Sequence, residues 1–220
     1  MKAIVVYGSE SGTTKRNIEK IVADWRAAGR WEVLEVLEGE EAAADGLANI
    51  AKRCDALLVA TSSFRQGDAP FNYDDFLAAL YRGAAADPKP LAGIQHAVLG
   101  FGDSHFDTYM NCPRLSDMLL EKCGSRRLAA RREIDVREKQ RGIADVAAWA
   151  AAVDAAMTSG ASADAAPVCA WTEPGNGQTY DKSLEYAPEP DAAPAAGTPT
   201  WLVAAAAVGA MGVVAYFVLA

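Results

Sequence analysis

The chain has 220 residues, 51% of them hydrophobic, and a formal net charge of -8 at pH 7. This acidic balance excludes the strongly basic surface typical of nucleic-acid-binding proteins, so we expect no nucleic-acid partner. The four cysteines show no CxxC spacing and there are only two histidines, so we expect unpaired thiols and no metal site.

Strand and helix patterns alternate over residues 1–157. Apolar runs predict four strands, at 2–7, 31–37, 55–61 and 94–99, of which the first is rich in β-branched residues, and 127–130 is a fifth, weaker one. Helical spacing of apolar residues predicts helices at 13–27 and 142–157. The interrupted alternation of the second strand is typical of a sheet edge, whereas the continuous apolar run of the third is typical of a strand covered on both faces. The pattern predicts one α/β domain with helices on both faces of a parallel sheet.

The C-terminal part of the chain predicts two further segments. Residues 158–200 hold six of the ten prolines, many alanines and no apolar period, which predicts a disordered, acidic linker. Residues 201–220 carry no charge, and a helix of that length rises roughly 30 Å, the thickness of the hydrocarbon layer of a bilayer. We therefore expect a C-terminal transmembrane helix that anchors the domain to a membrane.

The expected location follows from the two ends of the chain. The apolar run at the N-terminus is short and is followed at once by polar residues, unlike a signal peptide. We therefore expect a single-pass protein with its N-terminal domain in the cytosol. No basic residue flanks the anchor, which slightly favours the endoplasmic reticulum over the mitochondrial outer membrane.

The loop after the first predicted strand is a candidate anion site, because ligands of such sheets bind at the carboxyl ends of strands. It holds Ser9, Glu10, Ser11, Gly12, Thr13 and Thr14. The N-terminus of the helix that follows favours an anion. The loop lacks the lysine of a nucleoside-triphosphate loop and is not GxGxxG. It predicts either a cradle of neutral donors for one phosphate group or an ordinary serine-rich helix cap.

The loops after the third and fourth predicted strands each carry an aromatic residue. The polar and aromatic candidates are Thr61, Ser62, Ser63, Phe64, Gly67, Phe101, Gly102, Asp103, Phe106 and Tyr109. Two exposed aromatics beside one crevice favour a flat ring stacked between them. Together with a phosphate, a flat ring on this fold indicates flavin mononucleotide, FMN. The alternative is that Phe64 and Phe106 pack inward, which is less favoured because all three loops agree on a flavin site.

Three motifs resemble those of a known family. YGSESGTT, TSSFRQGDAPFN and LGFGDSHFDTY, in this order, are similar to the flavodoxin-type FMN domain of the diflavin reductases, which include cytochrome P450 reductase, nitric oxide synthase and the sulfite reductase flavoprotein. The resemblance covers roughly residues 1–157. It implies a flavodoxin-like three-layer sandwich whose five-stranded parallel sheet has the order 2-1-3-4-5, with FMN at its carboxyl edge.

The resemblance also implies roles for individual residues. The loop from Ser9 to Thr14 would hold the phosphate, and Phe64 and Phe106 would cover the two faces of the isoalloxazine ring. Tyr109 matches a further aromatic of the site, and Asp135 matches an acid that follows the fifth strand.

The chain departs from the family pattern at several positions, and around the fifth strand Arg132-Glu133-Ile134-Asp135 stands where the family has a glycine-rich motif. Arg65 stands where the family usually has glycine, which restricts the backbone and would favour an anionic reduced flavin. Asp103 replaces the usual asparagine or serine and would act in the opposite sense.

The leading hypothesis is an electron-transfer protein, the component of an oxidoreductase system and not a self-sufficient enzyme with catalytic residues. FMN would pass electrons from a separate FAD- and NAD(P)H-dependent reductase to a membrane-bound acceptor, such as a haem protein or desaturase. The alternatives are an FMN-dependent quinone or small-molecule reductase, and a flavin-free interaction module on the same fold.

Overall fold

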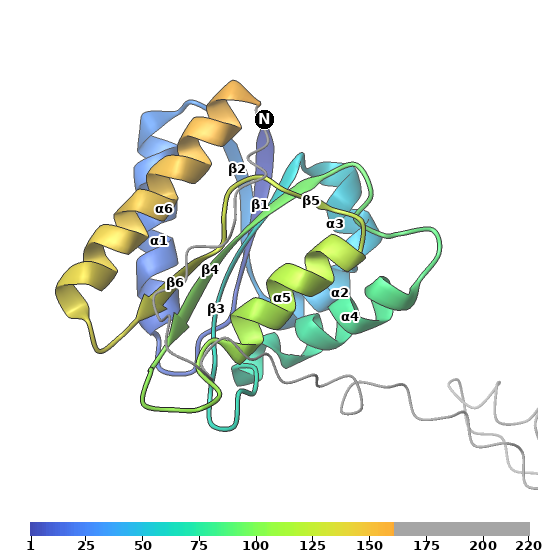
Figure 1. The fold of residues 1–220 in the computed structure, drawn as a ribbon. Coiled ribbons are helices and arrows are strands. Elements are labelled where there is room, and N and C mark those ends of the chain that lie inside the picture. Colours follow the sequence, from blue (N-terminus) through green and yellow to red (C-terminus); the bar gives the residue numbers. More distant parts are fainter. Residues whose placement is uncertain (161–220) are drawn as a thin grey trace, which may run out of the picture. The chain divides into compact units, whose positions relative to one another are not determined.

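A parallel sheet lies between two layers of helices in the computed structural model, which describes residues 1–160 (Figure 1). Its strands are β1 (Lys2–Tyr7), β2 (Glu32–Glu38), β3 (Ala56–Ser62), β4 (Gln95–Gly102), β5 (Arg126–Arg127) and β6 (Arg132–Asp135). The order is β2-β1-β3-β4-β5, and β6 also pairs with β4. The predicted order 2-1-3-4-5 and the three-layer fold are confirmed.

The helices divide between the two faces of the sheet (Figure 1). One face carries α1 (Thr13–Ala28) and α6 (Lys139–Ser159). The other carries α2 (Gly39–Asp45), α3 (Leu47–Arg53), α4 (Asp74–Ala85) and α5 (Asn111–Lys122), with the 3-10 turn η1 (Phe71–Tyr73) before α4.

Two apolar cores result, because successive side chains of a strand point to opposite faces. On β1, Ala3 and Val5 pack in the core beneath α1 and α6. Ile4 and Val6 pack in the core beneath α2 to α5. All four side chains are fully buried, which explains why the central strands are apolar without interruption.

The predicted elements match the structure closely in the first half of the chain. The strand predicted at the sheet edge is β2, which pairs with β1 alone and has a register shift opposite Ala3 and Ile4. Among residues 1–160, no helix is long and apolar enough to cross a membrane. The anchor predicted at 201–220 and nearly all of the linker predicted at 158–200 lie outside the described residues.

The fifth strand is a correction. Residues 127–130 were predicted to form it, but its place is shared by the two short strands β5 and β6, which pair with the start and the end of β4. Between them, Leu128 is fully buried. The interruption coincides with charged residues that turn inward, which an apolar pattern does not predict.

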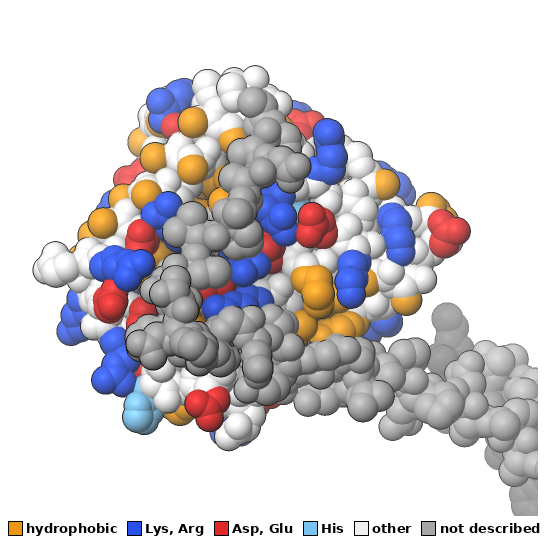
Figure 2. All heavy atoms as spheres, viewed as in Figure 1, with side chains coloured by type: hydrophobic (Ala, Val, Ile, Leu, Met, Phe, Trp, Pro, Cys, Tyr) orange, Lys and Arg blue, Asp and Glu red, His pale blue; other side chains and the backbone are white. Residues whose placement is uncertain are grey.

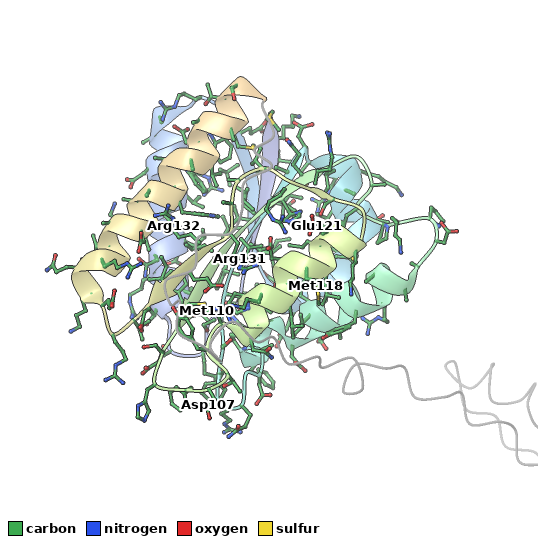
Figure 3. All side chains as sticks on the ribbon, in the orientation of Figure 1. Asp107, Met110, Met118, Glu121, Arg131 and Arg132 are labelled. Atoms are coloured by element: carbon green, nitrogen blue, oxygen red, sulfur yellow. The ribbon has the colours of Figure 1, made fainter. Side chains whose placement is uncertain are left out.

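A buried ion cluster lies behind this interruption. Arg114 of α5 donates two hydrogen bonds of 2.8 Å to Glu133 of β6. Arg131, which lies between the sheet and α5 (Figure 3), donates to Glu133 and, at 2.6 Å, to Asp117 of α5. Arg127 also donates to Asp117. The charges are paired, as buried charges must be.

The exposed face near α5 and α6 is mixed in charge. Figure 2 shows Lys and Arg side chains interspersed with Asp and Glu, and small apolar side chains along the alanine-rich α6. Such interspersed charge differs from the continuous basic stripe that a nucleic-acid backbone attracts.

Candidate cofactor site

The carboxyl ends of the strands border one cavity of about 630 Å³. Eleven of the residues predicted from sequence line it: Glu10, Ser11, Thr13, Thr14, Ser62, Ser63, Phe64, Phe101, Gly102, Asp103 and Asp135. The fold thus brings together candidates that are more than a hundred residues apart in the chain.

The first loop forms the polar end of the cavity. Gly12 immediately precedes α1 and has the left-handed conformation, with φ of 79°, and no side chain of the described region caps the first turn of the helix. The amides of that turn are therefore available to an anion. The Ser11 and Thr13 hydroxyls lie 3.4 Å apart and add donors. This arrangement favours the phosphate cradle over the ordinary helix cap.

Two features of this loop were not predicted from the sequence. Arg16 donates a hydrogen bond of 3.3 Å to the Thr13 hydroxyl, so a cation stands beside donors that were expected to be neutral. Ser9 does not line the cavity, and its amide donates to Asn72 at 2.9 Å. Ser9 therefore fixes the loop to the turn before α4.

The second loop is a tight turn closed on itself. The amides of Phe64 and Asp68 each donate to the carbonyl of the other, at 2.9 and 2.8 Å. Arg65 lies inside the turn with φ of 43°, a left-handed backbone that disfavours residues with a β-carbon. Its guanidinium lies 5.0 Å from the centre of the Phe64 ring. Phe64 is thus held at the cavity wall by the turn on one side and a cation on the other.

Residues near the start of α5 hold this turn in place. The Thr108 hydroxyl donates to the Arg65 carbonyl, and the Asn111 side-chain amide donates to the Gly67 carbonyl, both at 3.1 Å. Gly67 has φ of 85°, and a β-carbon there would lie 2.8 Å from that of Asn111. Gly67 therefore supports the turn from behind and does not line the cavity.

Thr61 also lies behind the cavity. It is fully buried, and its hydroxyl lies 3.7 Å from the Cys112 sulfur. The predicted unpaired thiols are confirmed for Cys54 and Cys123, which are buried and form no disulfide in the described part of the chain, and Cys112 is buried as well. Burial raises the pKa of Cys54 to about 11 and that of Cys123 to about 12, so both stay protonated and unreactive at neutral pH.

The third loop brings one predicted aromatic close to the site and leaves another outside. Phe106 does not line the cavity; its side chain is 52% exposed and packs edge-on against His105. Tyr109 is buried against Gly102, where a β-carbon would lie 3.0 Å from its ring. Its hydroxyl has no hydrogen-bond partner within residues 1–160, and burial raises its pKa well above the usual value.

Two carboxylates shape the far wall of the cavity. Asp135, nearly fully buried, accepts from the amides of Ser104 at 3.4 Å and Arg137 at 3.1 Å. Asp103 accepts from the His105 amide at 2.9 Å and lies 3.8 Å from the Arg137 guanidinium. Asp135 therefore ties the loop after β4 to the loop after β6.

Further lining residues were not predicted from the sequence: Asn17, Ile134, Val136, Lys139, Gly142, Ile143 and Val146. Most belong to β6 and to the first two turns of α6. The sequence could have indicated these residues, because α6 follows directly after a strand whose carboxyl end lies at the ligand-binding edge of the sheet. They were missed because the fifth strand was predicted at the wrong residues. No group of three metal-ligating side chains is found in the described part of the chain.

Known proteins resemble this chain. The sequence model of one protein family, described as Flavodoxin, matches residues 5–149. A bifunctional cytochrome P450/NADPH–P450 reductase of Bacillus cereus is 30% identical over 136 residues, or 61% of this chain and 12% of that protein. A methionine synthase reductase of Caenorhabditis elegans is 27% identical over 132 residues, or 60% of this chain and 18% of that protein. The chain spans less than a fifth of the length of these relatives.

Solved structures agree with the sequence matches. A mutant flavodoxin of Pseudomonas aeruginosa has a TM-score of 0.60 and 27% identity, covering 71% of this chain and 99% of that one. Oxidised flavodoxin 1 of Bacillus cereus has a TM-score of 0.56 and 19% identity, covering 70% of this chain and 97% of that one. The second likeness concerns the fold alone.

FMN is the cofactor of flavodoxins, and the residues of the cavity fit it. The uncapped turn of α1, with its hydroxyls, suits a phosphate, and the nearby Arg16 complements its charge. Phe64 and Phe101 contribute the apolar surface that a flat ring requires. The prediction of FMN is confirmed, whereas the contacts of individual residues with it stay predictions.

Proposed function

Because the chain belongs to the flavodoxin family, we propose that it is an electron carrier that uses FMN, with a separate FAD- and NAD(P)H-dependent reductase as donor. FMN can accept electrons in pairs and release them singly, while the protein positions the ring and tunes its potential. The observation that carries the proposal is the cavity itself, which has phosphate donors at one end and an apolar slot at the other. Similarity to parts of two cytochrome P450/NADPH–P450 reductases and of a methionine synthase reductase supports the same role.

A neighbouring groove supports docking of a protein partner beside the flavin. It has a volume of about 390 Å³ and shares Glu10 and Phe64 with the cofactor cavity. Its remaining lining residues are Glu40, Arg65, Asp68, Ala69, Phe71, Asp74 and Asp75. Five carboxylates against one guanidinium give the groove a negative charge.

The groove also offers an apolar contact, since the Phe71 ring is 81% exposed. A partner with a basic rim and an apolar centre would match this surface, and opposite charges would raise its rate of association. Phe64 lines both the cofactor cavity and the groove, so a partner in the groove would lie directly beside the flavin.

The acceptor in this proposal is a membrane-bound haem protein or desaturase. The uncharged segment 201–220 would tether the domain to the bilayer, and the segment 158–200 would let it reach both partners. The domain would lie in the cytosol, with the endoplasmic reticulum favoured over the mitochondrial outer membrane.

A spectroscopic titration tests the proposal. The full chain, purified in detergent and loaded with FMN, would be reduced stepwise while its absorbance is recorded. An electron carrier should show a semiquinone and should reduce cytochrome c when NADPH and a separate reductase are added. The rate should fall as salt is raised, because salt screens the acidic groove. Failure of the chain to bind FMN would contradict the proposal.

A second candidate, an FMN-dependent quinone or small-molecule reductase, is favoured by one observation. Phe106, which was expected to cover one face of the flavin, is exposed and does not line the cavity. Such an enzyme would oxidise NADPH directly, without an added reductase, and would pass electrons to a quinone in pairs. Because FMN is the family's cofactor, a flavin-free module is not proposed.

A further inference from the structure

We propose that Ile143 of α6 forms the wall of the flavin slot opposite Phe64, in the place where an aromatic side chain was expected. The proposal rests on FMN binding in the cavity. The Ile143 side chain is 68% exposed, although it borders a cavity that is mostly apolar. Val136, 41% exposed, borders the same cavity. Exposed apolar side chains that gather at one cavity mark a binding site more often than a scattered exposed residue does.

The geometry of α6 directs these side chains to the cavity. Lys139, Gly142, Ile143 and Val146 all line it, and their spacing places them on one face of the helix. Gly142 allows α6 to approach the sheet closely, since a β-carbon there would lie 3.1 Å from the Cγ2 atom of Ile134. The first turns of α6 therefore lie against the carboxyl end of β6.

The same face of α6 continues into the core. Trp149 and Val153, further along the helix, are buried against the sheet, and Val146 is half-buried beside them. Ile143 is thus the exposed end of an apolar stripe that becomes progressively more buried through Val146 to Trp149 and Val153. A flat apolar ring in the cavity would cover this end as well.

Phe106 does not occupy this place. Its ring packs edge-on against His105, with 5.7 Å between ring centres, outside the cavity. The slot is therefore bordered by an aromatic ring on the Phe64 side and by aliphatic side chains on the α6 side. An aliphatic wall binds the ring by burial of apolar area, without the added gain of aromatic stacking.

Titration of FMN and of riboflavin into the apo form of the full chain, followed by flavin fluorescence, tests this assignment. Ile143→Ser should weaken the binding of both flavins about tenfold, because it removes most of an apolar contact. Ile143→Leu, which keeps the apolar volume, should bind both flavins nearly as the parent does. Ala147→Ser, an exposed position on α6 outside the cavity, is the matched control and should change neither affinity.

Phe106→Ala supplies the decisive comparison and should change both affinities less than twofold. A tenfold loss in Phe106→Ala, or unchanged binding in Ile143→Ser, would overturn the assignment of Ile143. The melting temperature of each apo variant should equal that of the parent, since Ile143 and Phe106 are both exposed. If the parent chain binds neither flavin, the cofactor site itself fails, which is a different result from failure of Ile143 alone.

Discussion

The two halves of the sheet are built on different principles. The half formed by β2, β1 and β3 is held by apolar packing. The conformations of its loops depend mainly on residues close by in the sequence. The half formed by β4, β5 and β6 has a divided outer strand and a buried cluster of paired charges. A strand can be predicted from its own sequence when its side chains follow a regular apolar pattern. A strand that carries buried charges cannot, because its charged residues resemble surface residues until their ion-pair partners are known.

Breaking the buried ion cluster should have the largest effect and tests this comparison directly. Arg114→Met would remove two hydrogen bonds from the buried Glu133 carboxylate and leave Arg131 as its remaining partner. Leaving a buried charge without any partner costs about 3 to 5 kcal/mol. Because Arg131 stays, the free energy of unfolding should fall by about 3 kcal/mol, the lower end of that range. Urea denaturation of the apo chain measures it.

An exposed ion pair in the first half is the matched control. Glu35→Gln removes one of the two carboxylate partners of Arg53, in a pair whose two side chains are 37% and 41% exposed, and leaves Asp45 as the other. Such a pair contributes about 0.2 to 1 kcal/mol. Similar losses in the two variants would contradict the contrast between the halves.

The stability of the second half should also depend on acid. Burial tends to raise the pKa of Asp117, but hydrogen bonds from His96 and Arg127 and the charge of Arg131 outweigh it and lower the pKa to about 2. The ordinary value is 3.8, so the unfolded chain binds a proton there before the folded chain does. The carboxylate therefore contributes about 2 kcal/mol above pH 4, which is lost as the pH falls toward 2.

Asp117→Asn removes this titration and separates it from those of other groups. The difference in unfolding free energy between the parent and the variant should be constant from pH 5 to 7 and should shrink between pH 4 and pH 2. A difference that does not vary with pH would show that Asp117 is not the titrating group. Urea denaturation across this range provides the measurement.

Much of the fold could be predicted from the sequence, because the central strands have an apolar pattern that follows from their burial. β1 and β3 are apolar because both their faces are covered, and the strand order was implied by resemblance to a known family. β6 was missed because Arg132 and Glu133 look like surface residues. Only the packing of α5 shows that Glu133 is 1% exposed and paired.

The candidate site divides in the same way. The loop from Ser11 to Thr14 was predicted from local features, namely a glycine, hydroxyls and a helix start. Ile143 and Lys139 were missed, because their place in the cavity depends on how α6 follows β6. Phe106 was expected in the slot from the family pattern, and the conformation of the third loop places it outside.

A substitution at the polar end of the cavity sharpens the contrast between its two ends. Thr13→Ala removes a hydroxyl that lines the phosphate cradle. A hydrogen bond to a charged group contributes about 1.5 to 3 kcal/mol, so FMN should bind at least about tenfold more weakly. Riboflavin, which has no phosphate, should bind as before. Equal losses for both flavins would contradict the phosphate assignment.

The smallest effect concerns Arg65, where local backbone preference and tertiary contacts disagree. Its φ of 43° costs a residue with a β-carbon about 1 to 2 kcal/mol, yet the turn is kept by the hydrogen bond from Thr108 to the Arg65 carbonyl. Arg65→Gly should relieve this cost and lose the contact with Phe64, giving a net gain of about 0.5 kcal/mol in the free energy of unfolding. Arg65→Ala keeps the β-carbon and loses the same contact, so it should be slightly destabilising. If urea denaturation showed both variants to be equally stable, the contact with the Phe64 ring, and not the backbone angle, would determine how this position affects the free energy of unfolding.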